Sequence, residues 1–296
     1  MSTGSTWTSS AGTHASDSSA SAIDVLAIGP HPDDVELFIG GTTRHLAQLG
    51  HRVVILDLTR GESATRGTPA IRAVEAARAA EVLGVARDQL GLPDGGVRGD
   101  DPEQAKALVT YLRTHRPELV MCPWTEERHP DHEAAAALVL RAVFLASAGG
   151  YLPELPRHVV REVLHYPMRV LTKPSFVVDI SHVRAAKQQA IACHASQVGH
   201  GQPFAPSAGG HAGQVNQVGQ SGQVDRLELL ADMAPTLVGH AHASGLDAIA
   251  ARDAFYGAQI GVAAAEPFIM RATLHLADPL AHLRTRPGPA LLFEAR

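Results

Sequence analysis

The regular alternation of short apolar runs with longer amphipathic segments between residues 23 and 146 constrains the fold of this chain most strongly. Short apolar runs bounded by turn residues are typical of buried strands, whereas apolar residues at i, i+3, i+4 and i+7 indicate a helix. The sequence predicts strands at 23–29, 53–58, 89–93 and 118–122, and helices at 35–49, at 69–83, from 102 onward and at 133–146. Because βα units in succession need right-handed crossovers, we expect a Rossmann-like, three-layer α/β sandwich with a mostly parallel central sheet.

The order of the strands decides which loops meet. If the order is 3-2-1-4-5, the first and fourth strands are neighbours at the topological switch point, where open α/β sheets bind ligands. The loops that follow these two strands contain the stretches HPDD at 31–34 and WTEERHPDH at 124–132. The sequence therefore predicts a functional site built from these two loops.

The remaining segments define the domain organisation. Residues 1–21 are rich in Ser, Thr, Ala and Gly and predict a disordered tail, and residues 22–296 are expected to form one domain. Within it, the Gly- and Gln-rich stretch at about 199–226 predicts a flexible insertion. Further elements are expected as strands at 161–166 and 176–180, a helix from 181 to about 194, and helical character at 245–260.

Composition excludes several classes of partner. The chain has 25 Lys and Arg against 30 Asp and Glu, a formal charge of -5, and no basic block, so we expect neither nucleic acid nor a membrane surface as partner. No apolar run is long enough for a transmembrane helix, and the first residues lack the pattern of a signal peptide, so we expect a cytoplasmic location. Cys122 and Cys193 form no C-x-x-C pair, so a metal site must use histidines and carboxylates.

His31, Asp33 and Asp34 stand where the first strand passes into the first helix, in the stretch IGPHPDDVELFIGG. Residues three apart at such a junction can turn the same way, so His31 and Asp34 can share one cation. Asp33 then points elsewhere, which places a carboxylate beside the metal as a candidate general base. The alternative is an ordinary helix start capped by an aspartate, and this stretch alone does not decide between the two.

The loop after the fourth strand supplies a third ligand. His132 can complete a His-Asp-His set that leaves a position open for water, as catalytic zinc sites require. His129 can act as an imidazolium that stabilises an oxyanion or protonates a leaving amine, and Asp131 can orient it. The alternative is a polar loop with incidental histidines, which is disfavoured because both stretches fall on adjacent strand ends. Two helix N-termini directed at one point also favour developing negative charge.

The stretches GPHPDDVE and RHPDH resemble the PIG-L or LmbE-like family of zinc-dependent N-deacetylases, and the resemblance extends through most of residues 22–275. It includes LTRGE, GLPDGG, LPELPRH, KPSFVVDIS and AAEPF. The resemblance implies that zinc, or another divalent transition metal, is bound by His31, Asp34 and His132. It also implies that Asp33 is the general base and that His129 is its electrostatic or acid partner.

Within that family, PELP and KPSFVVDIS are most similar to the bacillithiol-pathway enzymes that deacetylate N-acetylglucosaminyl-malate. The stretch ACHASQ at 192–197 and the insertion that follows depart from that subfamily, whose sequence is more compact there and usually has an aromatic residue. The resemblance also implies a homo-oligomer, such as a hexamer, that acts on a small amino-sugar conjugate.

The expected reaction is hydrolysis of an acetamide on a glucosamine-type sugar, which releases acetate and a free amine. Arg72 and Arg128 are candidates for binding substrate hydroxyls or a carboxylate, with simple surface solvation as the alternative. Three other functions are alternatives: an amidase for another N-acyl sugar or thiol conjugate, a non-catalytic metal-binding protein, and a dinucleotide-binding enzyme. The last is disfavoured because G-P-H-P-D-D replaces the G-x-G-x-x-G phosphate cradle after the first strand.

Overall fold

The computed structural model describes residues 22–198, 245–273 and 277, which contain a seven-stranded sheet in the order β3-β2-β1-β4-β5-β7-β6. The strands are β1 (Val25–Gly29), β2 (Val53–Thr59), β3 (Ala86–Leu92), β4 (Leu119–Pro123), β5 (Glu162–Tyr166), β6 (Phe176–Asp179) and β7 (Ala265–Met270). Strands β1 to β5 pair in parallel, and their order is the assumed order 3-2-1-4-5. Strand β7 pairs antiparallel with both β5 and β6 and extends the sheet beyond the expected strands.

The helices follow the capping signals of the sequence. They are α1 (Asp34–Gln48), α2 (Pro69–Leu83), α3 (Pro102–His115), α4 (Pro130–Ser147), α5 (Arg184–Cys193), α6 (Ala195–Val198) and α8 (Gly245–Ala258), with a 3-10 turn η1 (Ser181–Val183). The side chain of Thr68 accepts a hydrogen bond from the N–H of Ile71, and Asp101 caps α3 in the same way. Gly84 ends α2 at φ 70°, a left-handed conformation that glycine adopts without a steric penalty.

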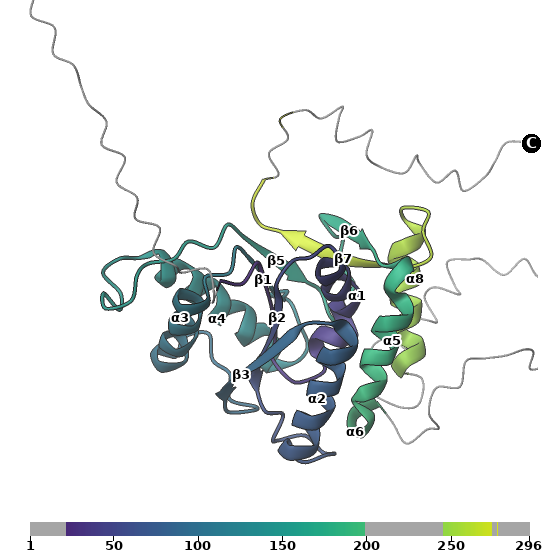
Figure 1. Cartoon of the computed structure of the whole chain (residues 1–296), viewed down its shortest axis with the longest axis horizontal. Coiled ribbons are helices and arrows are strands. Elements are labelled where there is room, and N and C mark those ends of the chain that lie inside the picture. The colour runs from purple at the N-terminus through teal and green to yellow at the C-terminus, as the bar shows by residue number, and fades with distance from the viewer. Residues whose placement is uncertain (1–21, 199–244, 274–276, 278–296) are drawn as a thin grey trace, which may run out of the picture.

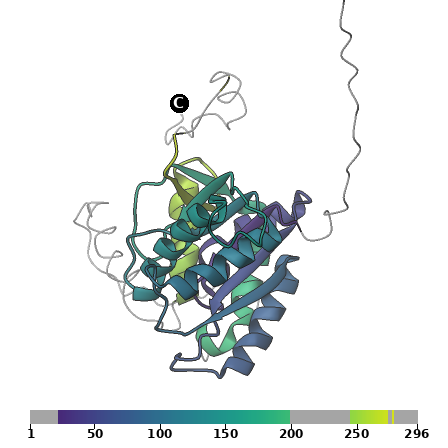
Figure 2. The same cartoon turned by 90° about the vertical axis from the view of Figure 1, so that its left-hand side faces the viewer.

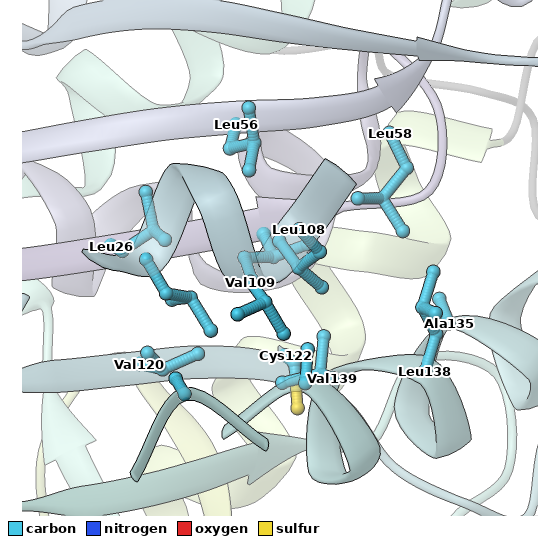
Figure 3. Close-up of a cluster of buried hydrophobic side chains, with 14 of the residues drawn as sticks. Leu26, Leu56, Leu58, Leu108, Val109, Val120, Cys122, Ala135, Leu138 and Val139 are labelled. Carbon is cyan, nitrogen blue, oxygen red and sulfur yellow. The ribbon is translucent and has the colours of Figure 1, made fainter. Parts of the chain in front are cut away.

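Helices cover both faces of the sheet and so form a three-layer sandwich (Figure 1). An apolar core lies between the sheet and the helices on each face. Helices α3 and α4 cover one face, in front of the sheet in the side view (Figure 2), and α1, α2 and α5 cover the other. Figure 3 shows the first core, where Leu26, Leu56 and Val120 of adjacent strands meet Leu108 and Leu138 of the covering helices. Alternate residues of each strand point to opposite faces, so a parallel strand buried on both sides has a continuous apolar run.

Helix α1 is kinked, and a buried carboxylate binds at the kink. Ile39 has the non-helical angles φ -138° and ψ 18°, so the N–H groups of the next turn are available. The Glu266 carboxylate accepts the N–H groups of Gly41 at 2.9 Å and Thr42 at 2.6 Å. The Lys187 ammonium lies 2.8 Å from Glu266 and 2.6 Å from Asp253. We name Lys187, Arg252, Asp253 and Glu266 the Lys187 cluster; it joins α1, α5, α8 and β7.

Two element boundaries differ from the expected ones for physical reasons. Strand β3 begins at Ala86, earlier than the expected residue 89. The polar Arg87 gave no sign of a buried strand in the sequence, but in the structure its guanidinium pairs with the buried carboxylate of Asp57. Helix α4 begins at Pro130 and not at 133, because His129 is its N-cap and proline is tolerated in the first turn. The expected tail at 1–21 and insertion at 199–226 lie outside the described residues.

Among the described residues, no helix has both the length and the apolar character that a membrane span needs.

Candidate active site

Three possible metal ligands lie close together at the carboxyl ends of β1 and β4, namely His31, Asp34 and His132. Asp34 Oδ2 lies 3.2 Å from His31 Nδ1 and 3.4 Å from His132 Nε2. Ligand atoms bound tetrahedrally to zinc at its usual bond lengths lie about 3.3 Å apart, so these distances fit such an ion. Asp34 is 4 % exposed and His132 is 5 % exposed. The donor set and its burial therefore fit a zinc-type cation.

Carboxylates hold the other side of the His31 ring. His31 Nε2 lies 3.1 Å from Asp94 Oδ1 and 3.2 Å from Asp131 Oδ2. The Asp131 carboxylate also accepts the N–H groups of Gly95 at 2.7 Å and Val97 at 3.3 Å. A histidine that binds a metal through one nitrogen usually donates the other N–H to a carboxylate, which fixes the orientation of its ring. Nδ1 of His31 is therefore the atom directed toward the metal.

The charges around His31 already favour a cation. Burial alone would lower the pKa of His31, but its hydrogen bonds to the carboxylates of Asp131 and Asp34 and the negative charges of Asp34 and Asp94 raise it to about 11. Burial would raise the pKa of Asp34, but His132 and His31 hold it well below the usual value. A proton thus sits where the ligand set can hold a metal, and metal binding at such a site releases protons.

Asp33 is the N-cap residue of α1, but its side chain makes no capping hydrogen bond. The alternative that Asp33 merely caps the helix is therefore not realised. Its backbone has φ 139° and ψ -23°, a region that residues with a side chain rarely adopt. Burial and the charge of the neighbouring Asp34 raise the pKa of Asp33 to about 6, against the opposing effects of His194 and Arg72. A carboxylate with such a pKa beside a metal-type site suits proton transfer near neutral pH.

His129 is exposed at the start of α4, and its ring centre lies 4.8 Å from that of His132 and 4.9 Å from that of His31. Its Nδ1 accepts the backbone N–H of Asp131 at 3.2 Å. Because Nδ1 is the acceptor, we assign the proton of the neutral ring to Nε2. Burial and the charges of His132 and His31 lower its pKa. The geometry thus favours a neutral N–H donor over the expected imidazolium. Asp131 contacts His129 through its backbone, because its carboxylate is directed at His31.

The two arginines expected at the substrate lie in different environments. Arg72 is 3 % exposed and donates to the carbonyl oxygens of Pro32 at 2.6 Å and Gly61 at 3.1 Å. Its Nη2 also lies 3.5 Å from Asp33 Oδ1. Arg128 is exposed beside His129. The binding of substrate by either residue stays a prediction.

A buried charge network beneath the site was not expected from the sequence. Glu36 is fully buried and pairs with the Arg87 guanidinium and with His194, whose Nε2 lies 3.3 Å away. Burial alone would raise the pKa of Glu36, but Arg87 and His194 lower it to about 2. The only sequence signal was indirect: Glu36 belongs to the stretch HPDDVE and His194 to ACHASQ. Asp94 was missed likewise, although it stands in GLPDGG at the end of β3.

The site and fold agree with the comparisons to known proteins. The family described as "PIG-L: GlcNAc-PI de-N-acetylase" matches residues 26–143, which include every ligand candidate. The diacetylchitobiose deacetylase of Thermococcus kodakarensis is 35 % identical over 188 residues, which cover 58 % of this chain and 69 % of the relative. The chain therefore belongs to the PIG-L family of N-deacetylases, hydrolases that cleave an amide bond.

Two further proteins show how widely the similarity extends. The 1D-myo-inositol 2-acetamido-2-deoxy-alpha-D-glucopyranoside deacetylase of Segniliparus rotundus is 28 % identical over 242 residues, which cover 58 % of this chain and 76 % of the relative. The crystal structure of a conserved protein from Thermus thermophilus superposes with a TM-score of 0.68 at 33 % identity, over 86 % of this chain and 98 % of that one. Most of the fold is thus shared with this solved structure.

Proposed function

We propose that the protein is a zinc-dependent hydrolase that removes the acetyl group from an N-acetylglucosamine-type conjugate. The observation that carries the proposal is the gathering of ligand atoms from His31, Asp34 and His132 within 4.8 Å of one another, with the uncapped carboxylate of Asp33 next to Asp34 in the chain. A non-catalytic metal site has no need for an extra carboxylate whose pKa is raised to about 6. The named relatives act on an acetylated chitobiose and an acetylated glucosaminyl-inositol.

His31, Asp34 and His132 would hold the zinc ion, which would supply Lewis acidity for activating water and polarising the amide carbonyl. Asp33 takes the proton of the attacking water, because its carboxylate makes no capping hydrogen bond and has a raised pKa, whereas the carboxylates of Asp94 and Asp131 are directed at the His31 ring. His129 stands beside the ligand set with a neutral N–H and stabilises the tetrahedral oxyanion or protonates the departing amine. The N-termini of α1 and α4 meet at this point and favour the same negative charge.

For the rest of the substrate we propose malate, attached to the N-acetylglucosamine as in the bacillithiol pathway. The support is the similarity of PELP and KPSFVVDIS to enzymes of that pathway, together with Arg128 beside His129. A guanidinium at this place can bind a substrate carboxylate with two parallel hydrogen bonds. The alternative is that the same site acts on another N-acyl sugar or on a thiol conjugate.

The test measures acetate release by the zinc-loaded protein, by the chelated protein and by the chelated protein after zinc is restored. The substrates are N-acetylglucosaminyl-malate, the inositol counterpart and N,N'-diacetylchitobiose, compared by kcat/KM. We expect release only with zinc and fastest with the malate conjugate. Preference for chitobiose or inositol would overturn the malate assignment and keep the deacetylase. Zinc binding without acetate from any substrate would leave the non-catalytic alternative.

A further inference from the structure

We propose that Arg72 is a positioning residue, which holds Asp33 in its unusual backbone conformation by binding the carbonyl group immediately before it. The inference rests on the proposed function in one respect, namely that Asp33 is the general base. It assigns Arg72 a task other than the binding of substrate oxygens.

The backbone of Asp33 needs such support. A residue with a Cβ atom is strained at φ 139°, and strain of this kind persists only where the surroundings fix it. The main chain fixes the downstream side, because the carbonyl of Asp33 accepts the N–H of Leu37 at 3.0 Å in the first turn of α1. The upstream side is the peptide between Pro32 and Asp33. A flip of that peptide would change ψ of Pro32 and φ of Asp33 together and would relieve the strain.

Arg72 blocks this flip. Its Nη2 donates to the Pro32 carbonyl oxygen at 2.6 Å, so the oxygen cannot turn away without losing a charge-assisted hydrogen bond. The same nitrogen lies 3.5 Å from Asp33 Oδ1. The Arg72 guanidinium therefore contacts both the Pro32–Asp33 peptide, which sets φ of Asp33, and the carboxylate of Asp33, whose direction depends on φ.

The guanidinium is itself fixed. Its Nη1 donates to the Gly61 carbonyl oxygen at 3.1 Å, and the residue is 3 % exposed. Gly61 makes the necessary room: a Cβ atom at this position would lie 1.8 Å from Arg72 Nη1. Gly61 also has φ 64°, which favours glycine. These contacts engage Nη1 and Nη2, whereas Nε has no hydrogen-bond partner among the described residues. The positioning role therefore rests on the two carbonyl contacts.

The test compares Arg72→Met, Arg72→Lys and Gly61→Ala, with Arg78→Met as the matched control. Arg78 is an exposed arginine on the same helix, so its loss is expected to leave kcat unchanged. We expect Arg72→Met to keep its zinc and its KM and to lose about 100-fold in kcat, the effect of a displacement of about 1 Å at a reacting group. Gly61→Ala is expected to lower kcat in the same way by displacing the guanidinium. Arg72→Lys, whose single ammonium reaches only one of the two carbonyls, is expected to lie in between.

A crystal structure of zinc-loaded Arg72→Met supplies a readout that does not depend on activity. We expect φ of Asp33 to become negative in the variant. An unchanged φ, or a raised KM with an unchanged kcat, overturns the positioning role. If Arg72→Met does not fold, Gly61→Ala and Arg72→Lys give the same two readouts. If the wild-type protein releases no acetate at all, the proposed function fails, whereas the angle of Asp33 in the variants still decides what Arg72 holds.

Discussion

Two buried polar clusters lie along helix α1 and are built on opposite principles. The metal-site cluster, at the first turn, consists of His31, Asp33, Asp34, Asp94, Asp131 and His132. The Lys187 cluster lies at the kink in the same helix, and its two cations face two carboxylates. Both are largely enclosed, so burial alone does not tell them apart.

The difference is in how far each cluster satisfies its own charges. In the Lys187 cluster, Glu266 receives an ammonium and two backbone N–H groups, and none of the cluster's buried polar atoms lacks a partner. The metal-site cluster crowds four carboxylates around two histidines and contains a strained residue, so its negative charges are not balanced by equal numbers of cations. A charge group that is complete by itself stabilises a fold, whereas an incomplete one is prepared for a ligand.

The largest expected effect comes from removing a ligand from the metal-site cluster. We expect Asp34→Asn and His132→Gln to lose both bound zinc and acetate release, because three protein ligands are the usual minimum for a catalytic zinc site. Zinc content by elemental analysis and acetate release are measured on the same samples. Glu133→Gln, which changes an exposed residue next to His132, is the control and should retain both. Full zinc content in both ligand variants would contradict the assignment.

A substitution in the Lys187 cluster should lower the free energy of unfolding and leave zinc binding unchanged. Lys187→Met leaves Asp253 and Glu266 as buried carboxylates without their cation, so the free energy of unfolding should fall by about 3–5 kcal/mol. Urea unfolding measures the loss, and the folded fraction should keep its zinc. The exposed Lys173→Met is the control, with an expected change within about 0.5 kcal/mol. Equal unfolding free energies of the two variants would show that the ion pairs of Lys187 do not stabilise the fold.

Strain at Asp33 predicts that glycine at this position stabilises the fold relative to alanine, although glycine usually destabilises a folded chain. Asp33→Gly should be more stable than Asp33→Ala by about 1–3 kcal/mol, because only glycine adopts φ 139° without a steric penalty. Both variants remove the carboxylate, so their difference in unfolding free energy isolates the backbone term. Alanine at least as stable as glycine would show that the conformation of Asp33 is not strained.

The smallest effect is a pH dependence. Asp33 acts as a base only when ionised, so kcat/KM should fall about tenfold per pH unit below its pKa. That pKa is about 6 without a metal, and a bound cation lowers it, so the acid limb should lie at or below pH 6. The profile is measured with zinc content checked at each pH. An acid limb above pH 7, or the same limb in the residual activity of Asp33→Asn, would contradict the role of Asp33.

The sequence predicted what depends on local pattern. The parallel sheet followed from βα repetition, and the order assumed for its first five strands is the observed one. His31, Asp34 and His132 were expected together because in that order their loops follow adjacent strands. The pairing of β7 with β5 was missed, since antiparallel contacts between Leu164 and Met270 leave no periodic signal. Contacts such as those of Glu266 with Gly41 or Arg72 with Pro32 were missed for the same reason. The expected hexamer stays a prediction, which light scattering of the purified protein tests.

The central claim is that Asp33 is the base whereas its neighbour in the sequence, Asp34, is a metal ligand. It is tested most directly by zinc content and acetate release of Asp33→Asn, with the exposed Asp100→Asn as control. We predict wild-type zinc content in both variants and a loss of acetate release of about 100- to 10,000-fold in Asp33→Asn alone. Near-normal acetate release by zinc-loaded Asp33→Asn, or loss of its zinc, would contradict the account.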